Sequence, residues 1–179
     1  MQDRPLEKGI YELILYSGHL EIRGTLEASP PRRLVDILND PNRPLLALKR
    51  ASILPLSGRA GSVPTSAPEL TVRKEEIIVA WLVRESQVQS SDALLTVHKV
   101  HRPVIAYAED FLIHGQYYMI SENTLHQTLD TLHDDFFALT QPSLESVTHP
   151  DIVLKEGLLA AIQRRRLTAM HLEQISSSG

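Results

Sequence analysis

The chain has 179 residues, a formal net charge of −4 at pH 7 and an ordinary globular balance of 42% hydrophobic and 22% charged residues, so it can form one domain or two small ones. The net negative charge argues against broad electrostatic binding to nucleic acid or to an anionic membrane. The chain has no cysteine, which excludes disulfides, thiolate metal ligands and thiol catalysis.

The first predicted element is a β-hairpin. Residues 10–16 and 20–26 are rich in β-forming residues, and Ser17-Gly18 lies between them. Apolar and polar residues alternate along the second strand, which predicts one buried and one solvated face. Gly24 interrupts that strand, and a glycine there indicates a bulge, a bend or a close backbone approach. Of these interpretations, we prefer a bend that curls the sheet to a glycine that lets a ligand approach the backbone.

A short helix and a buried strand are predicted next. Residues 32–39 place leucine and isoleucine at i, i+3 and i+4, which gives a helix one apolar face. Residues 45–48 are a short apolar run typical of a well-buried strand. Residues 57–70 are mostly small residues and proline, so we expect a mobile loop there. The isoleucine and valine of residues 75–83 predict another strand.

The chain contains an internal repeat. Residues 8–52 align without a gap on residues 99–143, at an offset of 91, and ten of these 45 positions are identical, against roughly three expected by chance from average residue frequencies. The identical positions are mostly apolar, which is typical of a retained core and not of a retained active site. The identical pairs are Lys8/Lys99, Ile14/Ile105, Tyr16/Tyr107, Ile22/Ile113, Gly24/Gly115, Leu34/Leu125, Leu38/Leu129, Ala47/Ala138, Leu48/Leu139 and Ser52/Ser143.

The end of each copy also shows a match. Residues 74–84 resemble residues 155–165 at an offset of 81. The second segment has helix-favouring residues, but the match predicts a strand, and we follow the match because tertiary context overrides propensity. The predicted fold is α+β and mostly β, with two β-β-α-β-β repeats packed about a pseudo-two-fold axis. Residues 1–84 and 99–175 are the expected repeats, with 85–98 as a linker.

The repeat predicts matching cores in the two copies. Each copy should bury the apolar face of its hairpin, its helix and its following strand. The residues expected to be buried are Ile14, Ile22, Leu34, Leu38, Leu46 and Leu48 in the first copy, and Ile105, Ile113, Leu125, Leu129, Phe137 and Leu139 in the second.

The sequence carries no established catalytic motif. Five of the eight histidines lie between residues 98 and 133, but they lack the spacing of a metal site. Gly58-Arg-Ala-Gly61 lacks the lysine and the following helix of a phosphate-binding loop. We therefore expect no cofactor, no metal and no enzymatic activity, and we interpret the histidines as scattered surface residues.

Divergence between the copies suggests an interaction surface. In the second copy His114 replaces Arg23, and Tyr117-Tyr118 replace Leu26-Glu27. Aromatic residues and arginine supply much of the binding energy at protein interfaces. The candidate residues are His114, Tyr117, Tyr118, Arg164, Arg165 and Arg166. Alternatively, these side chains close an intramolecular contact, and the arginines are a solvated strand end that prevents edge pairing.

The polar pattern of the first copy resembles a known group of sequences. Gly18–Gly24 (GHLEIRG), Arg33–Asn39 (RLVDILN) and Leu45–Leu48 (LLAL) are similar to small uncharacterised bacterial domains of unknown function. The second copy departs from this pattern at His114, Gln127 and Asp130. The resemblance implies a bacterial regulatory or accessory protein and assigns no activity.

The expected function is therefore a non-catalytic interaction or scaffold module. Its partner would be another protein or a second copy, and we expect no nucleic acid and no membrane. Residues 1–8 lack the apolar core of a signal peptide and no stretch could span a bilayer, so we expect a cytoplasmic protein. The alternative is a small-ligand or nucleotide-sensing regulatory domain that binds between the two repeats.

Overall fold

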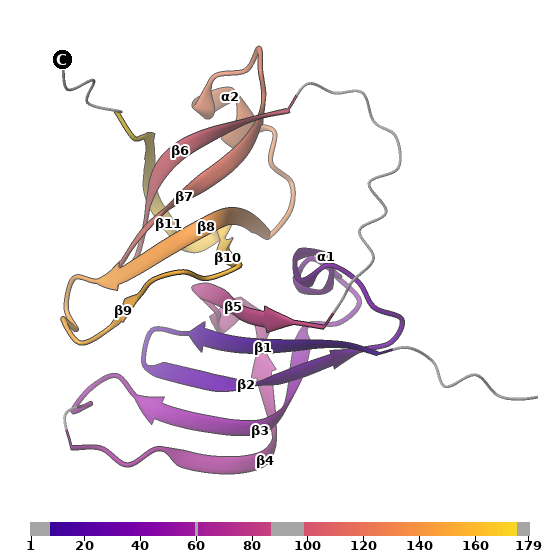
Figure 1. The fold of residues 1–179 in the computed structure, drawn as a ribbon, viewed down its shortest axis with the longest axis vertical. Helices are drawn as coiled ribbons and strands as arrows, with labels where there is room; N and C mark the ends of the chain where they lie inside the picture. Colours follow the sequence, from indigo (N-terminus) through magenta and orange to yellow (C-terminus); the bar gives the residue numbers. More distant parts are fainter. Residues whose placement is uncertain (1–7, 60, 87–98, 175–179) are drawn as a thin grey trace, which may run out of the picture. The chain divides into compact units, whose positions relative to one another are not determined.

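A computed structural model describes residues 8–59, 61–86 and 99–174, and it is mostly β (Figure 1). The chain divides into two compact units, residues 1–91 and 92–179. The linker expected over residues 85–98 lies outside the described residues except for Glu85, which ends a strand, and Ser86. None of the helices in the described ranges has the length and apolar character needed to cross a membrane.

Unit 1 is a five-stranded antiparallel sheet with one short helix. The spatial order of its strands is β5-β1-β2-β3-β4. The predicted hairpin around Ser17-Gly18 is confirmed as the β1–β2 pair. The elements are β1 (Gly9–Tyr16), β2 (Leu20–Ala28), α1 (Leu34–Leu38), β3 (Leu45–Pro55), β4 (Thr65–Arg73), the 3₁₀ helix η1 (Lys74–Glu76) and β5 (Val79–Glu85).

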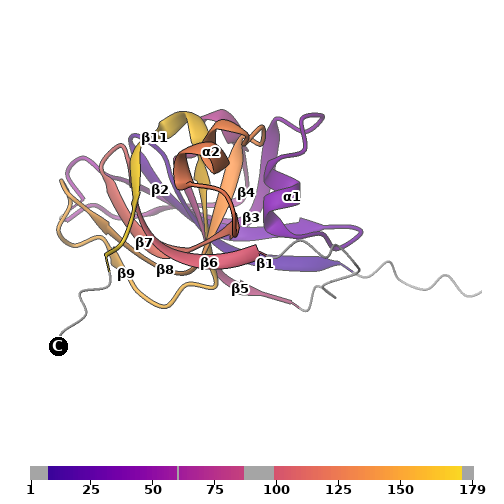
Figure 2. The same ribbon diagram turned by 90° about the horizontal axis from the view of Figure 1, so that it is seen from above.

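Unit 2 has the corresponding arrangement, with strand order β11-β6-β7-β8-β10 and a short extra strand, β9, on β8. In Figure 2 its strands curve around α2, which lies on the concave side. The elements are β6 (Lys99–Ala108), β7 (Phe111–Ile120), α2 (Leu125–Asp130), β8 (Phe136–Ser146), β9 (Val153–Leu154), β10 (Leu159–Gln163), the 3₁₀ helix η2 (Arg164–Arg166) and β11 (Leu167–Leu172).

The two units match at an offset of 91 from the first hairpin through β3 and β8, which span residues 45–55 and 136–146. Beyond that point the predicted match of residues 74–84 with residues 155–165, at an offset of 81, was wrong. Arg73 pairs with Leu45 in unit 1, and Gln163 pairs with Phe136 in unit 2, so β10 corresponds to β4 at an offset of 90. The similar residues of 74–84 and 155–165 occupy different elements, because strand pairing and not local composition determines the equivalence.

The loop expected over residues 57–70 is shorter in the structure. Residues 65–73 form β4, which pairs along its length with β3. Pro68 is compatible with this strand because β4 pairs with β3 alone among the described strands of the unit, and an edge strand tolerates a residue without an N–H. The small polar residues therefore predicted a loop, but pairing with the neighbouring β3 makes residues 65–73 a strand.

A glycine produces the same bulge in both units. The β2–β3 register shifts between Arg23 and Thr25, and the β7–β8 register shifts between His114 and Gln116. A Cβ on Gly24 would lie 3.1 Å from the Cβ of Leu48, and one on Gly115 would lie 2.8 Å from the Cβ of Leu139. Arg50 and Gln141, on the opposite strands, both have positive φ. The predicted bend is therefore a bulge that requires close backbone approach.

The predicted core is confirmed at nine of its twelve positions, which are buried. Ile105, Leu125 and Leu129 are only half-buried, so their prediction was wrong. Helix α1 buries three of its four apolar residues, whereas α2 buries none and is instead capped by Thr124, which exchanges hydrogen bonds with Gln127. Identical leucines in the two helices therefore have different surroundings.

Candidate interaction surface

One face of the unit 2 sheet gathers histidine and tyrosine side chains at its surface. Strand pairing places His101 opposite Tyr118, and it places Ile105 between His114 on one side and His171 on the other. Directly opposite residues of an antiparallel pair point to the same face. We call this set the exposed face of unit 2: His101, Ile105, Tyr107, His114, Tyr118 and His171.

The rings on this face are held in pairs. The rings of His101 and Tyr118 lie 3.8 Å apart between centroids. The hydroxyl of Tyr107 lies 3.3 Å from Nε2 of His171, with the two rings stacked at 5.8 Å. Cross-strand pairs of this kind order the side chains before any partner binds, which reduces the entropy cost of association.

The structure separates the two adjacent tyrosines that the sequence grouped together. Tyr118 is 46% exposed, whereas Tyr117 is 6% exposed and packs edge-on against Phe137 at 5.6 Å. Burial raises the pKa of the Tyr117 hydroxyl. Tyr117 is therefore a core residue and its assignment to the surface was wrong, because successive strand residues point to opposite faces.

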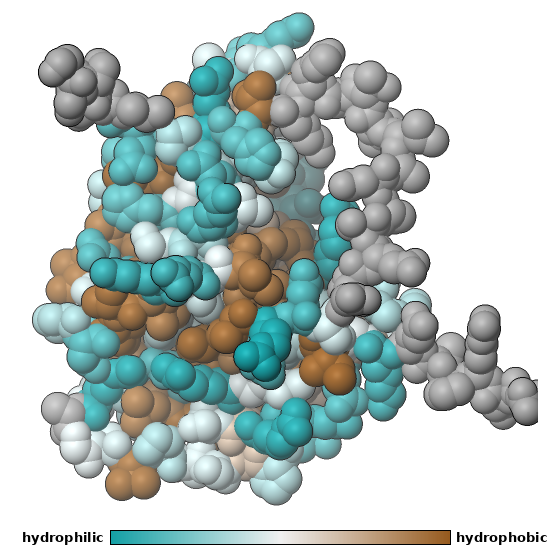
Figure 3. Space-filling view, in the orientation of Figure 1, coloured by the Kyte–Doolittle hydropathy of each residue, from teal (hydrophilic) through white to brown (hydrophobic). Residues whose placement is uncertain are grey.

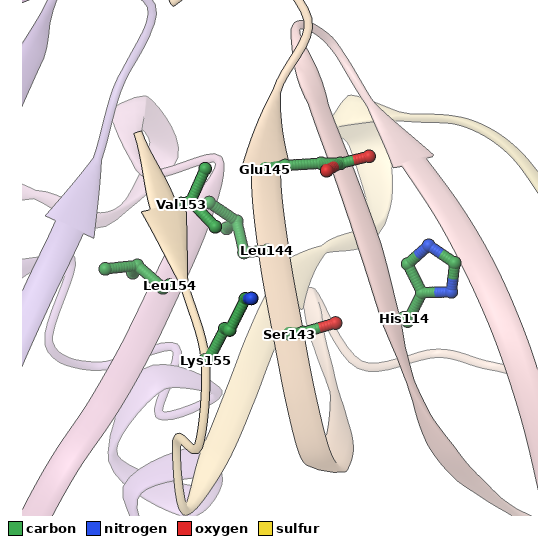
Figure 4. Close-up of a pocket in the computed structure, with 7 residues that line it drawn as sticks. All are labelled: His114, Ser143, Leu144, Glu145, Val153, Leu154 and Lys155. Carbon is green, nitrogen blue, oxygen red and sulfur yellow. The ribbon is translucent and has the colours of Figure 1, made fainter. Parts of the chain in front are cut away.

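His114 lies on the exposed face beside a carboxylate. Its Nδ1 is 3.5 Å from Oε1 of Glu173, which follows β11. His114 also borders a small depression of about 200 Å³, together with Ser143, Leu144, Glu145, Val153, Leu154 and Lys155. In Figure 4 Ser143, Glu145 and His114 extend toward the same side. The volume is below the range typical of small-molecule sites, so this depression supports a surface contact better than a ligand pocket.

Apolar side chains continue the surface beside this depression. Figure 3 shows apolar surface where β8 and β9 run in Figure 1. Val147 and Val153 are among the exposed apolar residues there, at 74% and 49%. Exposed apolar residues are typical of protein contact surfaces.

The three arginines lie on the 3₁₀ helix η2 and have structural contacts. Nη1 of Arg164 donates to the Leu132 carbonyl at 2.9 Å, while its Nε is buried without a hydrogen-bond partner. Arg166 donates to Glu109 at 2.8 Å. Arg165 is the most exposed, with its Nε 3.9 Å from Asp135. Strand β10 (Leu159–Gln163) confirms the strand predicted within residues 155–165, but the three arginines follow it on the 3₁₀ helix. Their link to the tyrosine surface stays a prediction.

At one end of this face unit 1 carries ion pairs where unit 2 carries rings, whereas at the other end the buried Tyr16 and Trp81 occupy the positions of Tyr107 and His171. Ile10 and Glu27 occupy the positions of His101 and Tyr118. Glu27 accepts hydrogen bonds from Lys8 at 3.2 Å and from Lys49 at 3.0 Å, and these bonds lower its pKa. The two units therefore have the same strand pairing on this face but differ in side-chain chemistry at the end that carries Ile10 and Glu27, or His101 and Tyr118.

Unit 1 also buries a carboxylate. Glu21 is 3% exposed and accepts hydrogen bonds from Arg23 at 2.7 Å, from Arg59 at 2.6 Å and from the Tyr16 hydroxyl at 3.2 Å. Burial alone would raise the pKa of Glu21, but the two arginines outweigh it and lower the pKa. Burial and the neighbouring Glu21 raise the pKa of Tyr16. A carboxylate paired in this way ties the loop after β3 to the sheet and is not available as a base.

Sequence reasoning missed four members of the exposed face: His101, Tyr107 and His171 were not named, and Ile105 was assigned to the core. His101 and Tyr107 share the parity of Ile105 along β6, so their common face was available from the strand pattern. His171 was missed because β11 was not predicted. Its sequence, LTAMHL, has only one β-branched residue and no phenylalanine, tyrosine or tryptophan.

The described residues contain no group of three metal-ligating side chains that could hold an ion. Comparison with known proteins adds no relative: no protein-family model, no curated protein and no solved structure matches the chain.

Proposed function

We propose that the chain is a tandem duplication of one β-β-α-β-β-β module that acts as a non-catalytic protein-interaction module in the bacterial cytoplasm. The shared element order, strand order and glycine bulge support the duplication. A pseudo-two-fold relation between the copies stays a prediction. The observation that supports the function is the exposed face of unit 2, where the His101–Tyr118 pair replaces the ion-paired end of the matched face of unit 1, and where Tyr107 and His171 are exposed although the matching Tyr16 and Trp81 are buried.

The chemistry of this face favours a protein partner. Tyrosine presents a large rigid area and a hydroxyl, so it contributes binding energy at a small entropy cost. The depression beside His114 is too small to bury a typical ligand. The resemblance of residues 18–48 to bacterial domains of unknown function is consistent with an accessory role and gives no substrate.

The test is partner capture with matched variants of the full chain. Tagged wild-type protein and the double variant His101→Ala/Tyr118→Ala are compared in the source cell by mass spectrometry of the captured proteins. The control is Ile10→Ala/Glu27→Ala, which changes the equivalent positions of unit 1. We expect the first variant to lose partners that the control retains, with little change in melting temperature because the sites are exposed. Equal capture by all three proteins contradicts the proposal.

A further inference from the structure

The last strand of unit 2 has an unusual edge. Among the described strands β11 lies at one end of the strand order, and it pairs with β6 alone. Residues Leu167–Leu172 contain no lysine, arginine, carboxylate or proline. Natural edge strands normally carry such residues to prevent pairing with other chains. The edge strand β4 of unit 1 follows that rule, because it contains Pro68, Glu69 and Arg73.

The backbone groups of β11 alternate in direction. Glu173 N–H donates to the Pro103 carbonyl at 2.8 Å. In an antiparallel pair the bonded residues alternate, so Ala169, His171 and Glu173 face β6, while Met170 and Leu172 direct their N–H and C=O groups outward. A bulge between Leu167 and Ala169 interrupts the ladder. The regular edge is therefore centred on His171.

We propose that β11 pairs antiparallel with β11 of a second copy of this chain. With His171 opposite itself on the two-fold axis, Met170 of each copy lies opposite Leu172 of the other, and four backbone hydrogen bonds form. The pairing does not depend on the proposed function, since it uses backbone groups of the strand edge, although His171 at its centre also belongs to the exposed face.

The charges near β11 favour a second copy of the chain as the partner of this edge. Arg165 precedes the strand and is exposed, and Glu173 follows it and is also exposed. In this register Glu173 of one copy lies opposite Ala169 of the other, four residues from Arg165, so the acidic end of each copy lies toward the basic end of the other. A two-fold axis makes every favourable contact occur twice. The contact is short, so we expect a weak, reversible dimer below the standard interface size.

Disulfide trapping tests the pairing, because the natural chain has no cysteine. The variants Ala169→Cys, Met170→Cys and His171→Cys each carry one thiol on β11. Ser66→Cys on β4 is the control for random collision. On a two-fold axis, opposed residues that do not bond to each other have Cα atoms about 4.5 Å apart, within disulfide range. We expect H171C to give a disulfide dimer fastest, and clearly faster than S66C.

A second change examines the backbone. Met170→Pro removes an outward N–H without removing a bond to β6, which an edge strand tolerates. In the H171C background it should slow trapping roughly tenfold or more, because each dimer loses two hydrogen bonds, while circular dichroism stays unchanged. The proposal is overturned if no β11 cysteine is trapped faster than S66C, or if trapping is insensitive to Met170→Pro. A chain whose β11 binds only extended segments of other proteins would give that result.

Discussion

Lys74 of unit 1 and Arg164 of unit 2 occupy the same place and make the same kind of contact. Each is the first residue of a 3₁₀ helix. The N–H of Lys74 donates to Pro44 O at 3.0 Å and that of Arg164 to Asp135 O at 2.7 Å, and both acceptors lie immediately before β3 or β8. Each cationic side chain then reaches carbonyls at or just after the C-terminus of its unit's helix, where positive charge is favourable.

Replacing Lys74 by methionine should destabilise unit 1. The buried Lys74 Nζ donates to Ile37 O at 2.6 Å and to Asp40 O at 3.1 Å. Its loss removes the side-chain donor from both carbonyls, although Asp40 O keeps the N–H of Arg43, and we expect a cost of about 1–3 kcal/mol. Arg164→Met should cost less, because Arg164 makes one such bond and is only half-buried. Urea unfolding of both variants measures the difference, and equal costs would contradict this assignment.

The two bulge glycines should resist substitution to different degrees. An alanine Cβ at Gly115 would lie 2.8 Å from the Leu139 Cβ, closer than real contacts, whereas at Gly24 the distance to Leu48 is 3.1 Å. We expect Gly115→Ala to cost about 1–3 kcal/mol through overpacking and Gly24→Ala to cost less. Thermal unfolding gives the order. A neutral Gly115→Ala variant would show that the bulge relaxes without strain.

Much of the fold could be predicted from the offset of 91. Both copies keep the same sheet and the same bulge, and this requires them to keep the same apolar spacing and the same glycine position. Two parts did not follow. β4 and β11 are edge strands of their units. One side of each is exposed to solvent, so their sequences lack the apolar pattern of a strand that is buried in the core. Residues such as Ser66, Pro68 and His171 therefore carry no strand signal of their own, and only pairing with a neighbour makes them strands.

The sequence named two residues of the surface that we propose for partner binding. The substitution of Arg23 by His114 and of Glu27 by Tyr118 pointed to a single face, because those positions lie opposite Ile14 and Ile10, or Ile105 and His101. Tyr117 was included through adjacency alone, and its parity places it inside. The three arginines were grouped as one run, but a 3₁₀ turn sends each to a different acceptor.

Truncation of the leucines at matched helix positions should destabilise the protein to different degrees. Leu38 is 2% exposed, whereas Leu129 is half-buried. Leu38→Ala should lower the unfolding free energy by about 2–5 kcal/mol, the range for a well-packed core leucine. Leu129→Ala should lower it by roughly half of that, because Leu129 buries less apolar area on folding. Chemical denaturation of the two variants tests this. If Leu129→Ala is the more damaging change, α2 has contacts that its exposure does not reveal.

Glu21 should make stability depend on acid pH. Its folded pKa lies below the ordinary value of 4.5, so the carboxylate contributes stability that is fully present above that value. The contribution is lost as the pH falls through the folded pKa, because protonation removes the charge that Arg23 and Arg59 bind. Glu21→Gln should therefore lower the unfolding free energy at pH 7 by about 1.5–3 kcal/mol, the range for hydrogen bonds to charged groups, and it should flatten the loss of stability below pH 4.5.

Salt distinguishes this buried pair from an exposed one. Glu27 also has a lowered pKa, from hydrogen bonds to Lys49 and Lys8, but its pairs lie at the surface and are screened by ions. In 1 M NaCl the effect of Glu27→Gln should largely disappear, whereas that of Glu21→Gln should persist because Glu21 is buried. Urea titrations between pH 3 and 7 at two salt concentrations give both results. If Glu21→Gln loses its effect in salt as Glu27→Gln does, the Glu21 network is solvated and does not hold the loop to the sheet.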